Sequence, residues 1–150
     1  MNMKTIALRF GEHFSPECGT IAAHQKLIDE LGYVWYGKMG NPVATRIVEE
    51  LKGLDDTKIL LINSGKADRY WAHVCEISRE TPDLIGIPEY YRDLTEKFRT
   101  WFKVTRFESA PRDIMSKCHV VSSGAALGEV SKHSMSPYFI INYDEKEGER

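Results

Sequence analysis

The alternation of apolar and polar residues predicts strands through most of the chain. Residues 4–10 alternate so that Ile6, Leu8 and Phe10 fall on one face of an extended segment. Residues 58–65 contain the continuous apolar run "ILLI", which is typical of a central strand that is covered on both faces. The same kind of pattern predicts further strands at 33–37, 69–78, 99–109 and 137–143.

Two segments near the N-terminus show helical spacing of their apolar residues instead. Residues 20–32 predict a helix with Thr20 as its N-cap and Gly32 as its C-cap. Its expected apolar stripe consists of Ile21, Leu27, Ile28 and Leu31. Residues 41–53 predict a second helix, with the Asn-Pro pair at 41–42 as N-cap and first helical residue. Its expected core face consists of Val43, Ile47, Val48 and Leu51.

The order of these elements favours the α+β class over a doubly wound parallel sheet. The strands between residues 58 and 107 follow one another too closely for a run of helical crossovers, so neighbouring antiparallel strands are expected there. A short helix is predicted over 110–118, and 119–134 looks poor in strand. We expect a strongly curved sheet or open β-barrel, flanked by helices, in a single domain over residues 1–150. Residues 144–150 predict a solvated tail that could link to a further domain.

Composition and charge narrow the function. The formal net charge is −2 and the isoelectric point is near 6.2, which argues against binding through one large basic surface. The three cysteines are widely separated and form no CxxC pair, so we expect a reducing compartment and neither a disulfide scaffold nor a metal centre. The N-terminal apolar run is short for a signal peptide, and no segment has the length of a membrane span. The expected location is cytoplasmic, with no cofactor.

Evidence for an enzyme is weak in the sequence. The five histidines form no HExxH motif and no zinc-deaminase signature, and there is no GxSxG nucleophile elbow. Cys118 and His119 are adjacent on a predicted strand, so their side chains point to opposite faces. We therefore expect a binding protein and not an enzyme, although an enzyme with an unrecognised site stays an alternative.

The aromatic residues are the strongest indication of a binding site. Trp35, Trp71 and Trp101 fall on three separate predicted strands, and Tyr90 and Tyr91 lie in the segment between the last two. Such rings can stack on an unpaired base, while short polar side chains contact its edge. Each tryptophan taken alone is also an efficient core residue. Ring stacking and core packing are both open at this point.

The order of these features resembles a known family. A "VWYG" strand precedes a helix, "ILLINSGKADRYWAHVCEIS" forms a strand, an Asn-Ser-Gly turn and a second strand, and "FRTWFKVTRFE" follows before a short helix and the polar stretch "VVSSGAALGEVS". This arrangement over residues 33–142 resembles the YTH and EVE branch of the PUA-like superfamily. The resemblance implies a bent-sheet, barrel-like fold and a pocket for one modified base, most simply a methylated one. It implies a partner nucleic acid, DNA or RNA, and a role as the recognition module of a modification-dependent restriction or defence system, joined to an effector domain or subunit.

The resemblance also implies a set of site residues. The base-binding cage would comprise Trp35, Tyr36, Asn63, Ser64, Gly65, Tyr90, Tyr91 and Trp101. Tyrosine replaces the tryptophan that YTH domains have at the second cage wall, Phe107 replaces the tryptophan of the later strand motif, and Trp71 has no counterpart and is expected to pack. Phosphate contacts are expected from Lys38, Lys66, Arg69 and Lys103. Two alternatives stay open. One is a generic RNA-binding module of the same fold with no preference for modified bases, and the other is a protein-interaction domain that binds a peptide through its aromatic residues.

Overall fold

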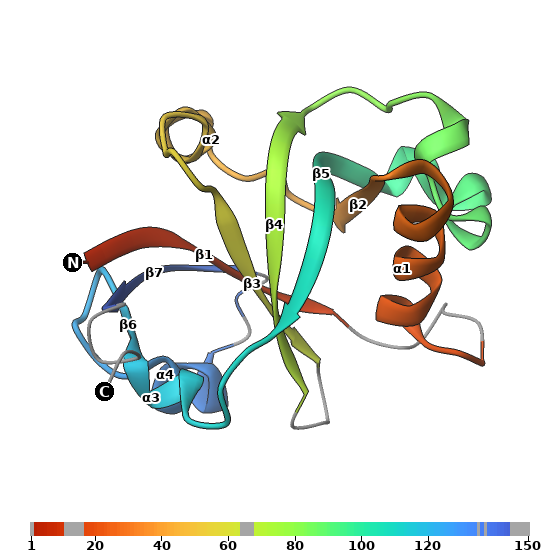
Figure 1. Cartoon of the computed structure of the whole chain (residues 1–150). Helices are drawn as coiled ribbons and strands as arrows, with labels where there is room; N and C mark the ends of the chain where they lie inside the picture. Colours follow the sequence, from red (N-terminus) through yellow and green to blue (C-terminus); the bar gives the residue numbers. More distant parts are fainter. Residues whose placement is uncertain (1, 11–16, 64–67, 135, 137, 145–150) are drawn as a thin grey trace. The chain divides into compact units, whose positions relative to one another are not determined.

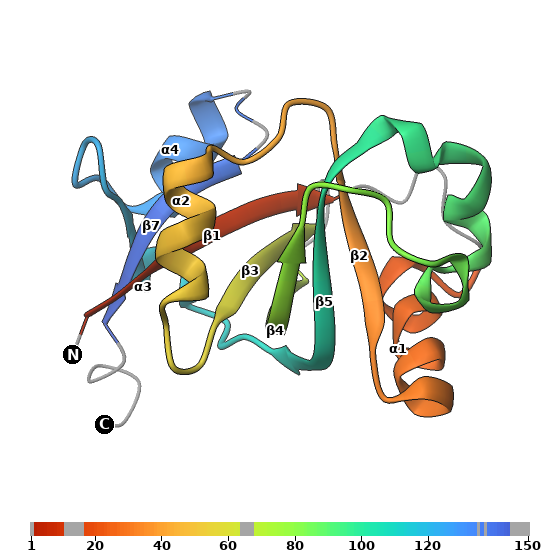
Figure 2. The ribbon, with the colours of Figure 1, turned by 90° about the horizontal axis from the view of Figure 1, so that it is seen from above.

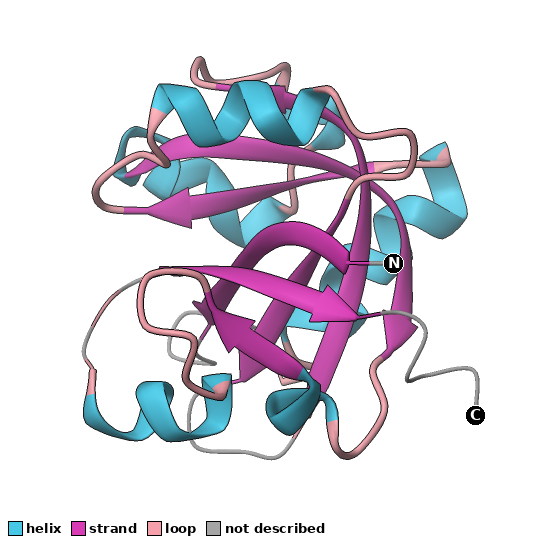
Figure 3. Cartoon of the chain, turned by 90° about the vertical axis from the view of Figure 1, so that its left-hand side faces the viewer, coloured by secondary structure: helices cyan, strands magenta, loops and turns pink. Residues whose placement is uncertain are grey.

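The computed structural model describes residues 2–10, 17–63, 68–134, 136 and 138–144 (Figure 1). Within this part of the chain the strands are β1 (Asn2–Phe10), β2 (Val34–Met39), β3 (Lys58–Asn63), β4 (Arg69–Ser78), β5 (Phe98–Ser109), β6 (Cys118–Val120) and β7 (Tyr138–Asp144). Their hydrogen-bonded order is β2-β5-β4-β3-β1-β7-β6, an open sheet. With the helices around it, this order confirms the α+β class with an open sheet (Figure 3).

The strands predicted to be neighbours are neighbours. β4 lies between β3 and β5, and Figure 1 shows β4 and β5 running in opposite directions. β3 has partners on both sides, as its continuous apolar run predicts. The sheet is mixed, because β1 pairs with β3 in parallel and with β7 antiparallel. The parallel pair requires a long connection, and α1, β2 and α2 lie within it.

The contacts of the chain divide it into two compact units. Unit 1 comprises residues 1–10, 59–71 and 109–150, and unit 2 comprises residues 11–58 and 72–108. A single domain over 1–150 stays a prediction, and residues 145–150 of the predicted tail lie outside the described residues.

Unit 1 has its core around the strands β1, β3 and β7. Trp71 is 2% exposed, and its ring centre lies 5.2 Å from that of Tyr143, so this tryptophan packs as expected. The short helices α3 (Ile114–Lys117) and α4 (Leu127–His133) complete the unit. The guanidinium of Arg9 donates to the carbonyl oxygens of Ser131 and Ser134 at 2.6 and 2.8 Å, which satisfies two acceptors at the end of α4. α4 falls within residues 119–134, the stretch that was predicted to be poor in strand.

Unit 2 contains α1 (Thr20–Leu31), α2 (Thr45–Lys52), β2 and most of β4 and β5. Two 3₁₀ segments, η1 (Leu84–Gly86) and η2 (Glu89–Lys97), connect β4 to β5. Figure 2 shows α1 lying along β2. Among the described residues no helix is long and apolar enough to cross a membrane.

The buried face of α1 differs from the predicted apolar stripe. Thr20 is the first helical residue instead of the cap, which is Gly19 with a φ of 93°. The two buried residues of α1 are Thr20 and His24, whereas Leu31 is 37% exposed. The prediction was wrong because aromatic rings of unit 2 surround His24 and turn that side of the helix inward.

α2 begins at Thr45 and not at the Asn-Pro pair at 41–42. The backbone N–H of Val43 donates to Thr100 Oγ1 at 3.1 Å, and the guanidinium of Arg79 donates to the carbonyl of Val43. These tertiary bonds hold the preceding segment in a non-helical conformation. The predicted core face is confirmed, because all of its members are buried: Val43, Ile47, Val48 and Leu51.

Candidate functional site

Unit 2 contains a cluster of aromatic side chains, here called the aromatic cluster. Its buried members are Trp35, Ile87, Tyr91, Phe98 and Trp101, and the half-buried Tyr33, Tyr90 and Leu94 pack against them. The rings meet at tilted and edge-to-face angles, with centres 4.3 Å apart for Tyr91 and Phe98 and 5.1 Å apart for Phe98 and Trp101. Such geometry is favourable for aromatic pairs. The cluster is therefore a packed core region as well as a candidate site.

The register of β2 against β5 assembles this cluster. Trp35 lies opposite Lys103 and Gly37 lies opposite Trp101. A Cβ atom on Gly37 would lie 2.7 Å from the ring of Phe98, so only glycine leaves room for that ring. Packing against Phe98 thus explains the glycine that follows "VWY" in the sequence.

The outer edge of the aromatic cluster is formed by Tyr33 and Lys103. The Lys103 ammonium nitrogen lies 4.5 Å from the centre of the Tyr33 ring and 5.9 Å from that of Trp35. It also lies 3.9 Å from Glu76 Oε1, a distance that makes a weak ion pair at a partly exposed position. Gly86 of η1 approaches the same rings, since a Cβ there would lie 2.6 Å from Tyr33 Cε2. The sequence analysis did not assign Tyr33 or Gly86 to the site.

His24 is fully buried beside the tyrosines. Its Nδ1 lies 2.8 Å from the carbonyl oxygen of Thr20, which can only accept, so Nδ1 carries a proton. The imidazole centre lies 5.2 Å from the Tyr36 ring and 5.1 Å from the Tyr91 ring. The only sequence indication was its helical spacing of four residues from Thr20, which places both on one face.

Burial raises the pKa of the Tyr91 hydroxyl well above its ordinary value of 10.0, and the neighbouring Tyr36 and Tyr90 raise it further. A hydrogen bond with Tyr90 acts in the same direction, while one from the backbone of Gly37 opposes it. Tyr91 therefore stays a neutral phenol at ordinary pH. The group is suited to hydrogen bonding and not to acting as a base.

The structure brings together five of the predicted cage residues. Trp35, Tyr90, Tyr91 and Trp101 belong to the aromatic cluster, and Tyr36 adjoins it through His24. Asn63 belongs to unit 1, where it ends β3 and is 7% exposed. The predicted residues Ser64 and Gly65 lie outside the described residues.

Two of the predicted base-binding residues hold a buried polar atom without a hydrogen-bond partner among the described residues. These atoms are the indole Nε1 of Trp101 and the side-chain oxygen Oδ1 of Asn63. Most buried polar groups in proteins are hydrogen-bonded, and each exception requires an explanation. The two atoms belong to different units, and the indole N–H of Trp101 is a donor of the kind with which a protein contacts the edge of a base.

The predicted phosphate-binding residues have different surroundings. Lys38 is 6% exposed, and its ammonium donates to the carbonyl oxygens of Met39 and Asn41 at 3.2 and 2.5 Å. Burial lowers its pKa from 10.5. Arg69 lies in unit 1, Lys103 is at the edge of the aromatic cluster, and Lys66 is outside the described part of the chain.

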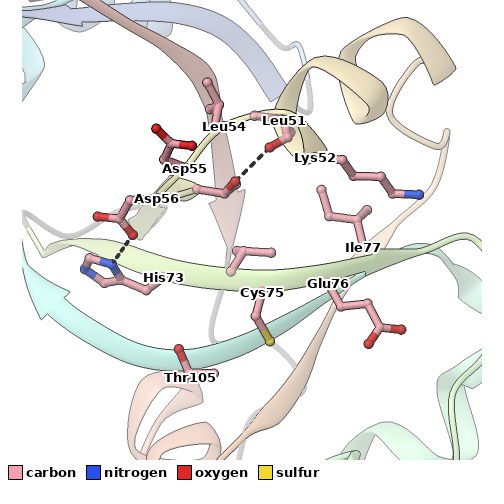
Figure 4. A pocket seen from close by; sticks show the side chains of 12 residues that line it. Leu51, Lys52, Leu54, Asp55, Asp56, His73, Cys75, Glu76, Ile77 and Thr105 are labelled. Atoms are coloured by element: carbon pink, nitrogen blue, oxygen red, sulfur yellow. Dashed lines mark hydrogen bonds and ion pairs between the residues drawn. The ribbon is translucent and has the colours of Figure 1, made fainter.

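Unit 2 also contains a polar hollow. It has a volume of about 400 Å³, and Figure 4 shows His73, Cys75 and Thr105 on its strand side with Asp55 and Asp56 across from them. His73 Nδ1 lies 3.5 Å from Asp56 Oδ1. The acidic side chains make this hollow unfavourable for a phosphate group.

His73 Nε2 faces two partners that require opposite proton positions. It lies 2.9 Å from Glu108 Oε1, to which only a protonated nitrogen can donate, and 2.9 Å from Arg106 Nη2, from which only an unprotonated nitrogen can accept. The hydrogen bond from His73 lowers the pKa of Glu108, against a smaller opposing effect of burial. In the described part of the chain no three His, Cys, Asp or Glu side chains are placed to hold a metal ion.

Unit 2 combines a packed aromatic cluster, a lysine over its rings and a buried indole N–H that has no partner among the described residues, features that suit a ligand-binding module. The chain belongs to the Pua-like family: the model of that family, described as Pua-like, matches residues 6–142. Domains of this family are generally binding modules, and membership suggests a nucleic-acid- or RNA-binding function. Comparisons with curated proteins and with solved structures found no match.

Proposed function

We propose that this protein is a nucleic-acid-binding reader that holds a single modified base, most simply a methylated one, against the aromatic cluster. In this proposal the chain belongs to the YTH and EVE branch of its family. As a reader it would supply the recognition step of a modification-dependent restriction or defence system, with the catalytic step on a separate effector.

The observation that supports this proposal best is the buried indole Nε1 of Trp101, which has no hydrogen-bond partner among the described residues. The indole N–H can donate to an acceptor on a base. Core packing alone gives no reason for a buried donor without an acceptor, because leaving such a group unpaired costs about 1–3 kcal/mol.

The rings of the aromatic cluster provide the stacking surface in this proposal. Tyr33 is only half-buried, so a base can approach from the side where Lys103 lies over the Tyr33 and Trp35 rings. A base that stacks there takes the place of the ammonium, which then reaches the phosphate next to that base. Because Trp101 is fully buried, the rings must part before its N–H can contact the base.

A second candidate function is a generic RNA-binding module with no preference for modified bases. The close packing of Tyr91, Phe98 and Trp101 favours it, since these rings stabilise the fold without a ligand. In that case the affinity for every oligonucleotide would fall steeply with salt, and no single base would matter. A peptide-binding protein would show little dependence on salt.

The test is a binding panel of short oligonucleotides, each with one modified base, compared with unmodified strands of the same sequence. The wild-type protein is expected to prefer one modified strand. The substitution Trp101→Phe keeps a ring in place but removes the N–H. We expect it to lower the affinity for the preferred modified strand by about 2- to 12-fold. The affinity for unmodified strands should change little.

The matched control is Trp71→Phe, because Trp71 is equally buried but lies in the core of unit 1. This control should leave the preference among strands unchanged. Equal binding of all strands by the wild-type protein would exclude the reader and support the generic module. If Trp71→Phe and Trp101→Phe changed the preference equally, the effect would be one of stability and not of base contact.

A further inference from the structure

Unit 1 contains a hollow of about 540 Å³ where β4 begins and β5 ends. Its walls are formed by Arg69 and Tyr70 on one side and by Ser109 and Arg112 on the other. The backbone N–H of Ala110 donates to the carbonyl of Arg69 at 3.0 Å, so a main-chain hydrogen bond joins the two walls. The site is therefore built on fixed backbone and not on a single flexible segment.

Two arginines line the hollow. Arg112 is exposed and has no ion-pair partner among the described residues, and Arg69 is half-buried at the opposite wall. A guanidinium presents a planar fork of donors that matches the oxygens of a phosphate. Two arginines in the lining of one hollow favour an anion with several oxygens.

The remaining lining residues favour a ligand larger than an anion alone. Tyr70 adds a half-buried aromatic ring, and Asp68 adds an exposed carboxylate. The carboxylate would repel a free phosphate, but it can accept a hydrogen bond from a sugar hydroxyl or from the amine of a base. A volume of about 540 Å³ is within the usual range of about 300–1,000 Å³ for small-molecule sites.

We propose that this hollow is a nucleotide-binding subsite. Arg69 and Arg112 bind the phosphate, Tyr70 contacts the base or sugar, and Asp68 accepts a hydrogen bond from the same nucleotide. The nucleotide is either one unit of a bound strand or a free mononucleotide, and the chemistry is shared by both. The subsite rests on the nucleic-acid-binding function of the family and is independent of the aromatic cluster.

The experiment measures two ligands on the intact chain. An unmodified single-stranded oligonucleotide is titrated at several salt concentrations, and a nucleoside 5′-monophosphate is titrated separately, with inorganic phosphate as its reference. Arg112→Ala should lower the affinity for the oligonucleotide by about tenfold, because a charge-assisted hydrogen bond is lost. It should also reduce the salt slope by about 0.7–0.9, the value for one phosphate contact.

Arg99→Ala is the matched control, since Arg99 is an exposed arginine in unit 2 and its removal changes the net charge equally. It should change the affinity by less than about twofold, because Arg99 does not line the hollow and salt screens an exposed charge that makes no direct contact. Arg112→Lys keeps the charge but not the fork, and should recover only part of the loss. All these residues are exposed, so the variants are expected to fold.

Each outcome decides the matter. Binding of the oligonucleotide that depends on Arg112 assigns the subsite to a strand, and binding of the mononucleotide alone assigns it to a free nucleotide. Equal losses for Arg112→Ala and Arg99→Ala would overturn the proposal, as would inorganic phosphate that binds as tightly as the mononucleotide. A protein that fails the modified-base panel but passes this test would lose the proposed reader function and keep the subsite.

Discussion

The ammonium of Lys103 lies 4.5 Å from the centre of the Tyr33 ring, on the outer side of a cluster whose inner rings are fully buried. A cation over an aromatic face at this distance contributes about 0.5–1 kcal/mol where it is exposed to solvent. A stacking base competes for the same face. This relationship separates the residues of the aromatic cluster into an outer group that a ligand can reach and an inner group that supports the fold.

The first prediction compares an outer residue with an inner one. Trp35 is 7% exposed, so Trp35→Ala should lower the free energy of unfolding by about 3–5 kcal/mol, the usual cost of deleting a buried aromatic ring. Tyr33 is half-buried, so Tyr33→Ala should lower the free energy of unfolding clearly less than Trp35→Ala does. It should also abolish the preference for a modified base, because the stacking face is lost. Urea denaturation and the oligonucleotide panel measure the two effects. If Tyr33→Ala kept the preference, the outer ring would not contact the base.

The second prediction concerns two glycines that touch the same cluster. In Gly37→Ala the new methyl group would lie 2.7 Å from the buried ring of Phe98, which has no space to move, so the substitution should destabilise the fold strongly. In Gly86→Ala it would lie 2.6 Å from the far end of the Tyr33 ring, which is half-buried and so less confined than Phe98, and 3.0 Å from Cδ1 of Trp35. Thermal unfolding should show a larger loss for Gly37→Ala. An equal loss would mean that the Tyr33 ring is held as firmly as Phe98.

The third prediction concerns pH. The pKa of Glu108 is lowered from 4.5, first by the hydrogen bond from His73 and also by Lys58 and Arg106, although burial opposes the shift. A depressed pKa contributes stability above the unfolded value, and that stability is lost as the pH falls through the folded value. Glu108→Gln should therefore show a weaker loss of stability below about pH 4.5 than the wild-type protein. Since the carboxylate is about half-exposed, we expect less than about 1 kcal/mol.

Denaturant titrations between about pH 3 and pH 6 would measure this difference, because the window spans the ordinary range of a glutamate. Glu49→Gln serves as the control, since Glu49 is exposed and has no ion-pair partner in the described part of the chain. The two variants should differ only on the acid side. Parallel pH profiles for Glu108→Gln and the wild-type protein would show that the His73 bond does not act in solution.

The fourth prediction compares two lysines that the sequence assigned to phosphate binding. Lys38 donates to two backbone carbonyls, so Lys38→Met should lower the free energy of unfolding by about 1–3 kcal/mol and change oligonucleotide affinity little. Lys103→Met keeps the apolar stem but removes the charge at the edge of the aromatic cluster. This substitution should lower the affinity for all oligonucleotides, and it should reduce the slope of affinity against salt concentration by about 0.7–0.9. If Lys38→Met lowered the affinity and Lys103→Met did not, the bound strand would lie beside Lys38.

Some of this protein is determined by local sequence. The strands from β3 to β5, the core face of α2 and the class of the fold follow from patterns that repeat within a few residues. Family membership follows from short motifs in a fixed order, and the matched range of 6–142 is wider than the 33–142 from which the resemblance was drawn. Several aromatic residues of the candidate site were also identifiable, because tryptophan and tyrosine are few and fall on separate elements, although Tyr33 was not among them.

Other features were decided only by contacts between distant parts of the chain. The start of α2 depends on a hydrogen bond between Val43 and Thr100, residues 57 positions apart, and the local capping pattern contains no trace of it. The inward face of α1 depends on the tyrosines around His24, and the role of Lys38 depends on the carbonyls of Met39 and Asn41. The local sequence pattern indicates which residues can be buried and which carry charge. Only tertiary structure decides which partners they find, because burial and hydrogen bonding are satisfied by groups that folding brings together from elsewhere in the sequence.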